Sequence, residues 1–112
     1  MADDITIKPA DGTWVVRAGG AVLGESEKAL EVSQGDDVTV YFPKADIATV
    51  FLDASDKTES FPLGEATFYS IVTKSTTLQN SAWSFESPID GGSEITGYLA
   101  FETGDLVAVE KL

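Results

Sequence analysis

Six residues of types that bind ligands lie in or beside strand-like segments of this chain. They are two tyrosines, a tryptophan, a lysine and two carboxylates: Tyr41, Lys44, Asp46, Tyr69, Trp83 and Glu86. The aromatic rings would form walls with polar tips, and the lysine would hold an anionic group that a carboxylate orients. We therefore predict a ligand-binding site from these six residues. This prediction depends on Trp83 being partly exposed in a concave pocket, and it fails if Trp83, Tyr69 and Lys44 lie far apart. The alternative is that Trp83 anchors the core and that Lys44 and Asp46 belong to a solvated turn.

Several kinds of catalysis are excluded because the sequence has no histidine and no cysteine. A Ser-His-Asp triad, thiol catalysis and cysteine-ligated zinc each need one of these residues. The glycine motifs that bind phosphates and dinucleotides are also missing. Acid–base chemistry would depend on Asp, Glu, Lys or Tyr with a shifted pKa. We expect no cofactor and no metal site, and the carboxylates of Asp53, Asp56 and Glu59 are typical of a solvated turn.

The charge is strongly acidic, with 19 acidic and 7 basic residues and a net charge of −12. The basic residues are scattered, so we expect binding neither to nucleic acid nor to an anionic membrane surface. The acidity is typical of a soluble protein, and it would also suit a basic partner or a divalent cation. No apolar run approaches the roughly 20 residues that span a bilayer. The acidic start, Met1 to Asp4, lacks signal-peptide features, so we expect a cytoplasmic protein.

Short strands and turns are predicted along the whole chain, whose 112 residues are typical of a single domain. Residues 14–24 form a hairpin around Gly19 and Gly20. Residues 38–42 alternate as a strand that Pro43 ends. Further strands are predicted at 66–73, 82–86, 99–101 and 106–109, polar turns at 53–57 and 74–79, and a helical turn at 44–48. No helical period is sustained, so the fold is mainly β with one or two short helical turns.

Four groups of residues follow one another in a characteristic order. They are Phe42-Pro43-Lys44-x-Asp46-Ile47, then Thr58, Pro62, Gly64, Ala66 and Tyr69, then Ala82-Trp83-Ser84-Phe85-Glu86-x-Pro88, and finally Gly97-Tyr98-x-Ala100-Phe101. In this order they resemble bacterial domain-of-unknown-function family 427, over nearly the whole chain. The resemblance implies a single compact domain of short antiparallel strands in a twisted, tent-like sheet arrangement of the Mss4-like kind. The family is sometimes labelled nucleotidyltransferase-like.

The chain departs from the family pattern at two places. Lys44 stands where members usually have an arginine. The segment Phe61-Pro62-Leu63-Gly64 stands where members usually carry a cysteine–proline pair followed by a lysine. If that lysine serves catalysis or anion binding in relatives, this chain has lost it.

Three functions remain open. The first is a small soluble β-domain that binds a small ligand or a protein partner without catalysis. The second is a Mg²⁺-dependent enzyme of nucleotidyl or phosphoryl transfer, with Asp46 and Glu86 on the metal and Lys44 on a phosphate. The third is a structural or oligomerisation module that pairs through a strand edge or an aromatic patch. The oligomeric state stays open as well.

Overall fold

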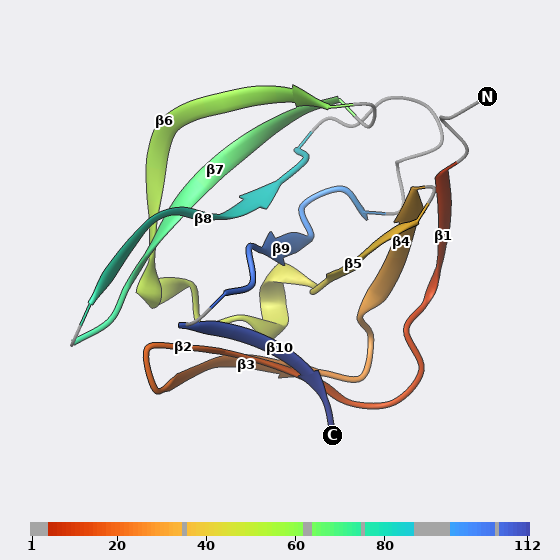
Figure 1. Ribbon diagram of the computed structural model, residues 1–112, viewed down its shortest axis with the longest axis horizontal. Helices are drawn as coiled ribbons and strands as arrows, with labels where there is room; N and C mark the ends of the chain where they lie inside the picture. Colours follow the sequence, from red (N-terminus) through yellow and green to blue (C-terminus); the bar gives the residue numbers. More distant parts are fainter. Residues whose placement is uncertain (1–4, 35, 62–63, 75, 87–94, 105) are drawn as a thin grey trace.

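Ten strands and two short 3₁₀ turns make up the regular structure of the described residues, and the prediction of a mainly β fold is confirmed. The computed structural model describes residues 5–34, 36–61, 64–74, 76–86, 95–104 and 106–112. The strands form three antiparallel sheets that enclose a common interior (Figure 1). The radius of gyration is 13.3 Å, close to the ~13 Å of a compact domain of about 100 residues. The narrower assignment to the Mss4-like fold stays a prediction.

The three sheets have simple strand orders. The first has the order β1-β4-β5, with β1 at Ile5–Pro9, β4 at Leu30–Gln34 and β5 at Asp37–Tyr41. The second has the order β10-β2-β3, with β10 at Val107–Lys111, β2 at Trp14–Ala18 and β3 at Ala21–Ser26. The third has the order β6-β7-β8-β9, with β6 at Leu52–Phe61, β7 at Gly64–Val72, β8 at Thr77–Ser84 and β9 at Leu99–Phe101.

The predicted hairpin is confirmed as β2 and β3. Gly19 and Gly20 connect the strands with φ values of 55° and 86°. Two consecutive residues with positive φ match the right-handed twist of a hairpin, and glycine adopts this conformation without a steric penalty. The hairpin brings Trp14 opposite Ser26 at its open end.

The polar turns predicted at 53–57 and 74–79 were wrong in part. Residues 53–57 lie within the ten-residue strand β6, and β8 already begins at Thr77. Among the described strands β6 pairs with β7 alone and is mostly exposed, so an edge position accommodates its charged side chains. The register shifts between Ala54 and Thr58, so the strand is irregular at the residues for which the turn was predicted.

Two single 3₁₀ turns follow Pro43, where one helical turn was predicted. They are η1 at Lys44–Asp46 and η2 at Thr49–Phe51. The amide of Asp46 donates to the carbonyl of Pro43 at 2.9 Å, and this bond closes the first turn. Within the described residues no helix has the length and apolarity that crossing a membrane requires.

A backbone bridge at Phe42 and Leu99 joins two of the sheets. The amide of Phe42 donates to the carbonyl of Leu99, and the amide of Leu99 donates back, each at 2.8 Å. The end of β5 therefore meets β9, so the β1-β4-β5 sheet and the four-stranded sheet touch along this line. Figure 1 shows β9 in the middle of the molecule, between β8 and β5.

The core forms two clusters because neighbouring residues of a strand point to opposite faces. On β9, Leu99 and Phe101 belong to the larger cluster and Ala100 to the smaller one. The larger cluster includes Val16, Ala18, Leu23, Phe42, Ile71, Ala82 and Val107. The smaller cluster includes Val32, Tyr41, Ala66, Phe68, Phe85 and Ile95. The bridge at Phe42 and Leu99 thus lies where the two halves of the core meet.

Candidate functional site

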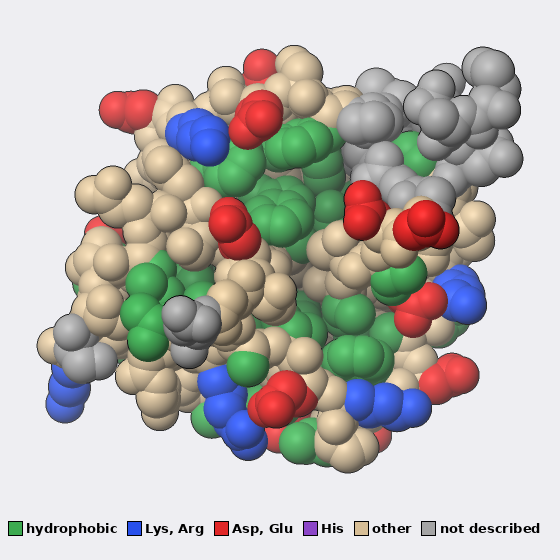
Figure 2. All heavy atoms as spheres, in the orientation of Figure 1, with side chains coloured by type: hydrophobic (Ala, Val, Ile, Leu, Met, Phe, Trp, Pro, Cys, Tyr) green, Lys and Arg blue, Asp and Glu red, His purple; other side chains and the backbone are tan. Residues whose placement is uncertain are grey.

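All three sheets contribute to one groove of about 500 Å³, here called the tryptophan groove. Its lining is Trp14 of β2, Glu31 of β4, Val38, Thr39 and Val40 of β5, Trp83 of β8, Phe101 of β9, Glu102 and Thr103 beyond β9, and Val109 of β10. Figure 2 shows a hollow on this face of the molecule, with hydrophobic side chains on its floor and acidic side chains around it. The groove is therefore apolar at its base and acidic at its rim.

Trp83 is held in the groove by contacts on its inner side. Its Nε1 donates to the hydroxyl oxygen of Tyr41 at 3.1 Å, and its ring lies 6.2 Å from that of Phe68. Burial raises the pKa of Tyr41 above 10.0, while the hydrogen bond from Trp83 lowers it by a smaller amount. Tyr41 thus stays neutral at physiological pH. The Trp83 ring is partly buried and lines the groove, whereas its N–H group donates a hydrogen bond inside the protein.

Trp14 lines the groove from the second sheet in a similar way. Its Nε1 donates to the backbone carbonyl of Asp11 at 3.1 Å, and its ring packs against the larger core cluster. Both indole N–H groups therefore bond within the protein. Each tryptophan lines the groove, and neither offers it a free N–H donor.

The charged residues that line the groove are both acidic. Glu31 and Glu102 are the carboxylates of the described lining, which contains no lysine and no arginine. Glu31 pairs with Lys8 at 3.4 Å, across β4 and β1. Among the described residues, Glu102 forms no ion pair within 4.0 Å. The hydroxyls of Thr39 and Thr103 complete the polar part of the lining.

Three of the six predicted site residues lie together away from this groove. Lys44 Nζ is 3.4 Å from Glu86 Oε2 and 5.9 Å from the centre of the Tyr69 ring. Ser84 Oγ donates to the same Glu86 oxygen at 2.7 Å. Tyr69 pairs with Ala82 and packs against the larger core cluster, whereas Trp83 packs against the smaller one. The Lys44 group therefore lies on the opposite face of β7 and β8 from Trp83.

Asp46 lies in a third place. Its Oδ2 accepts a hydrogen bond from Ser26 Oγ at 2.7 Å, and that same Oγ accepts one from the amide of Lys28 at 2.9 Å. These residues line a more polar hollow beside the end of β3. The six predicted residues are thus distributed over three places. Trp83 alone lines the tryptophan groove, with Tyr41 directly behind it.

Sequence reasoning missed Trp14, Glu31, Phe101 and Glu102 as groove residues. Trp14 is the second tryptophan of the chain and precedes a clear hairpin, so its residue type was a usable signal. The two glutamates carried no such signal because they are two of nineteen acidic residues. Their position depends on which strand ends the topology brings together.

Glu86 is expected to titrate below the ordinary glutamate pKa of 4.5. The hydrogen bond from Ser84 is the largest single cause of the lowered pKa, desolvation opposes it, and Lys44 lowers the pKa further through its charge and through a hydrogen bond. Because the folded pKa is lowered, the contribution to stability is present above pH 4.5 and is lost as the pH falls through the folded pKa. It is small, since the side chains of Lys44 and Glu86 are 40% and 49% exposed.

The measurement is an NMR titration of the Glu86 carboxyl carbon in the protein and in two variants. S84A is expected to raise the Glu86 pKa, because the hydrogen bond from Ser84 is the largest single cause of its lowering, and K44M is expected to raise it as well. An unchanged Glu86 pKa in S84A would show that the hydroxyl does not lower it.

Two comparisons with known proteins complete the description of the site. A family model described as a domain of unknown function (DUF427), with the short name NTP_transf_9, matches residues 6–111. No curated protein matches the chain.

Proposed function

The chain belongs to the DUF427 family, as its resemblance implied, and from this premise we propose that it is a binding domain for a small organic ligand, without catalysis of its own. The single observation that carries the proposal is the pair of tryptophans. Trp14 and Trp83 come from different sheets and line one groove. Its volume of about 500 Å³ lies within the roughly 300–1,000 Å³ typical of small-molecule sites.

The groove is better suited to binding than to chemistry. Its lining has aromatic and aliphatic side chains, two threonine hydroxyls and two carboxylates that come from different parts of the chain. Apolar walls with a few polar groups are typical of ligand pockets. Within the described lining no hydrogen bond joins a threonine hydroxyl to a carboxylate, which is the contact by which a general base activates a nucleophile.

Metal-assisted transfer finds less support in the side-chain contacts. Its two proposed metal ligands are engaged by separate serines, Asp46 by Ser26 and Glu86 by Ser84. In the part of the chain that the structure describes, no three acidic side chains gather as a metal site would need. Binding in the tryptophan groove is therefore the function that the geometry favours.

An oligomerisation role through the longest edge strand is also disfavoured. Strand β6 carries Asp53, Asp56, Lys57 and Glu59 along an exposed edge. Charged side chains on an edge strand oppose pairing with a second chain. The register shift in β6 adds to this effect.

The proposal predicts that a bound ligand shifts both indole N–H signals in NMR. The titration uses a panel of nucleotides, sugar phosphates, carboxylic acids and amines, each with and without Mg²⁺. A groove ligand changes the environment of Trp14 and Trp83 together, so both signals are expected to give the same dissociation constant. A panel that leaves both signals unchanged would refute small-ligand binding and favour a protein-interaction role.

Two valine variants test whether the ligand binds in the tryptophan groove. Val38 lines the groove and is 58% exposed, while Val22 on β3 is 53% exposed and is not part of the lining. V38R is expected to weaken binding about tenfold, or ~1.4 kcal/mol, because the longer side chain occupies the groove. V22R should leave the affinity within about twofold, a change of under ~0.5 kcal/mol. Equal effects of the two variants would place the ligand elsewhere.

A further inference from the structure

The tryptophan groove presents hydrogen-bond acceptors and few donors. Both indole N–H groups already donate hydrogen bonds within the protein: that of Trp14 to the carbonyl of Asp11, and that of Trp83 to the hydroxyl of Tyr41. The side-chain donors left in the described lining are the hydroxyls of Thr39 and Thr103, and each hydroxyl is an acceptor as well. The carboxylates of Glu31 and Glu102 add acceptors only. An anionic ligand would meet no positive partner there, whereas a cationic one would meet two carboxylates.

The electrostatics of the lining favour the same class of ligand. Glu31 is partly neutralised by Lys8, whereas Glu102 has no ion-pair partner among the described residues. The net charge of −12 adds a field that attracts cations from a distance. Lys111 lies opposite Trp14 in the sheet register. Its side chain runs beside Gly12 and is not part of the described lining.

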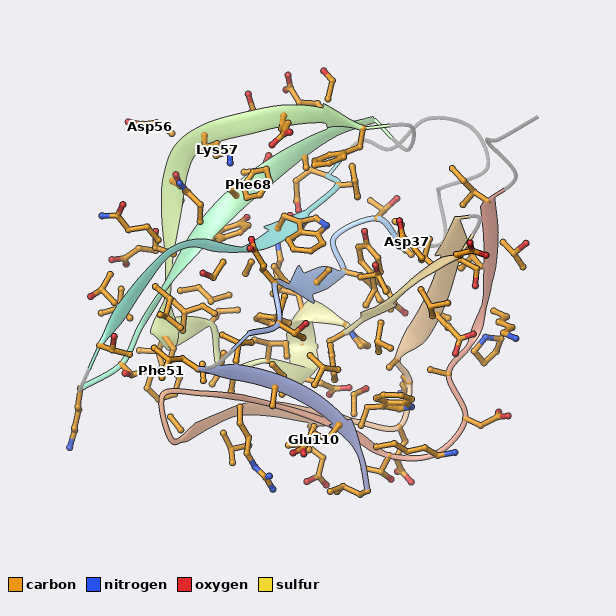
Figure 3. All side chains as sticks on the ribbon, viewed as in Figure 1. Asp37, Phe51, Asp56, Lys57, Phe68 and Glu110 are labelled. Atoms are coloured by element: carbon orange, nitrogen blue, oxygen red, sulfur yellow. The ribbon has the colours of Figure 1, made fainter. Side chains whose placement is uncertain are left out.

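The same fold already places cations over aromatic rings outside the groove. Lys57 Nζ lies 4.6 Å from the centre of the Phe68 ring, and Figure 3 shows the two side chains close together. Lys44 Nζ lies 5.9 Å from the centre of the Tyr69 ring. For Trp14 and Trp83 the described part of the chain supplies no such cation. Tryptophan is the aromatic side chain with the strongest cation–π attraction.

We propose that the tryptophan groove selects a small organic cation, an alkylammonium or quaternary ammonium group with an apolar body. The positive group lies against a tryptophan ring of the groove, whose lining also holds the carboxylates of Glu102 and Glu31. The apolar body covers Val38, Val40 and the ring of Phe101. This inference rests on the proposed function and names the chemical class of its ligand.

The test uses three probes of nearly equal shape and different charge. They are choline, its neutral carbon analogue 3,3-dimethylbutan-1-ol, and the anion 3,3-dimethylbutanoate, titrated at constant ionic strength while the two indole signals are followed. Choline is expected to bind about tenfold more tightly than the neutral analogue. The anion is expected to bind more weakly than either. Higher salt should weaken choline binding more than binding of the neutral analogue.

Charge-removing variants separate the carboxylates of the groove from the net charge. E102Q is expected to weaken choline binding about fivefold and to leave the neutral analogue nearly unchanged. The matched control is E110Q, which removes one negative charge from β10 outside the described lining (Figure 3). Glu110 pairs with Arg17 between side chains that are half exposed, so its loss should have little effect on stability.

The outcomes separate this inference from the proposed function. If the neutral or anionic probe binds as tightly as choline, the groove binds ligands but does not select cations, and the inference is overturned. Equal effects of E102Q and E110Q would also overturn it, because net charge alone would then explain the preference. If none of the three probes and no member of the wider panel moves the indole signals, both the inference and the proposed function fail.

Discussion

F42A is expected to lower the free energy of unfolding by about 3–5 kcal/mol. Phe42 is fully buried, and its ring meets the edge of the Phe101 ring with centroids 6.0 Å apart. The same residue forms the backbone bridge to Leu99 that joins two sheets. A cavity there would open within the larger core cluster. Since small domains are stable by roughly 5–15 kcal/mol in total, this variant would lose a large part of its stability.

The measurement is urea unfolding followed by tryptophan fluorescence. The control is V50A on η2, whose side chain is 86% exposed and whose loss should change stability by less than about 0.5 kcal/mol. F42L retains most of the side-chain volume and should fall between the two. A loss of less than about 1 kcal/mol in the free energy of unfolding of F42A is well below the range for a buried phenylalanine. Such a result would contradict the burial and packing of the Phe42 ring described above.

G24A is expected to destabilise the protein by about 1–3 kcal/mol, in the manner of an overpacked core. A Cβ atom at Gly24 would fall against the backbone carbonyl oxygen of Asp46 and 2.6 Å from Cδ1 of Ile47. A backbone oxygen cannot rotate away as a side chain can. The bridge between Gly24 and Ile47, and the 2.7 Å bond from the amide of Ala48 to the carbonyl of Leu23, would have to shift.

The matched control for this variant is G104A. A Cβ at Gly104 would meet no atom within 4 Å, and its φ lies outside the positive range. G104A should therefore be neutral, or stabilise by up to ~1 kcal/mol through a less flexible unfolded chain. Thermal unfolding of both variants measures the difference, and hydrogen exchange at the Ala48 amide should quicken in G24A alone. Equal melting temperatures would contradict the close approach at Gly24.

Local chemistry was sufficient to predict several elements. The glycine pair at 19–20 predicted a tight hairpin because few other residues adopt two consecutive positive φ values. The alternation of Val38 to Phe42 and the proline after it predicted a strand and its end. The turn predicted at 53–57 failed because the sequence does not reveal that β6 is an edge strand, where charged residues are tolerated.

The candidate site was harder to predict because it depends on registers between strands. Tyr69 and Trp83 are both aromatic and lie on adjacent strands. Because Tyr69 pairs with Ala82, and Trp83 with Phe68, the two rings point to opposite faces. A register changed by one residue would have put Tyr69 and Trp83 on the same face. Glu31 and Glu102 reach the groove only because the bridge at Phe42 and Leu99 brings β5 and β9 together.

The pairing of β10 with β2 has a consequence for the order of folding. Arg17 and Glu110, which pair across these strands, are 93 positions apart in the sequence. Closing so long a loop costs chain entropy before any contact compensates for it, and domains dominated by such non-local strand pairs fold slowly. During synthesis the buried faces of Val16 and Ala18 stay uncovered until Val107 and its neighbours have left the ribosome. The newly made chain must therefore remain soluble with an open core, and its acidic surface helps to keep such chains apart.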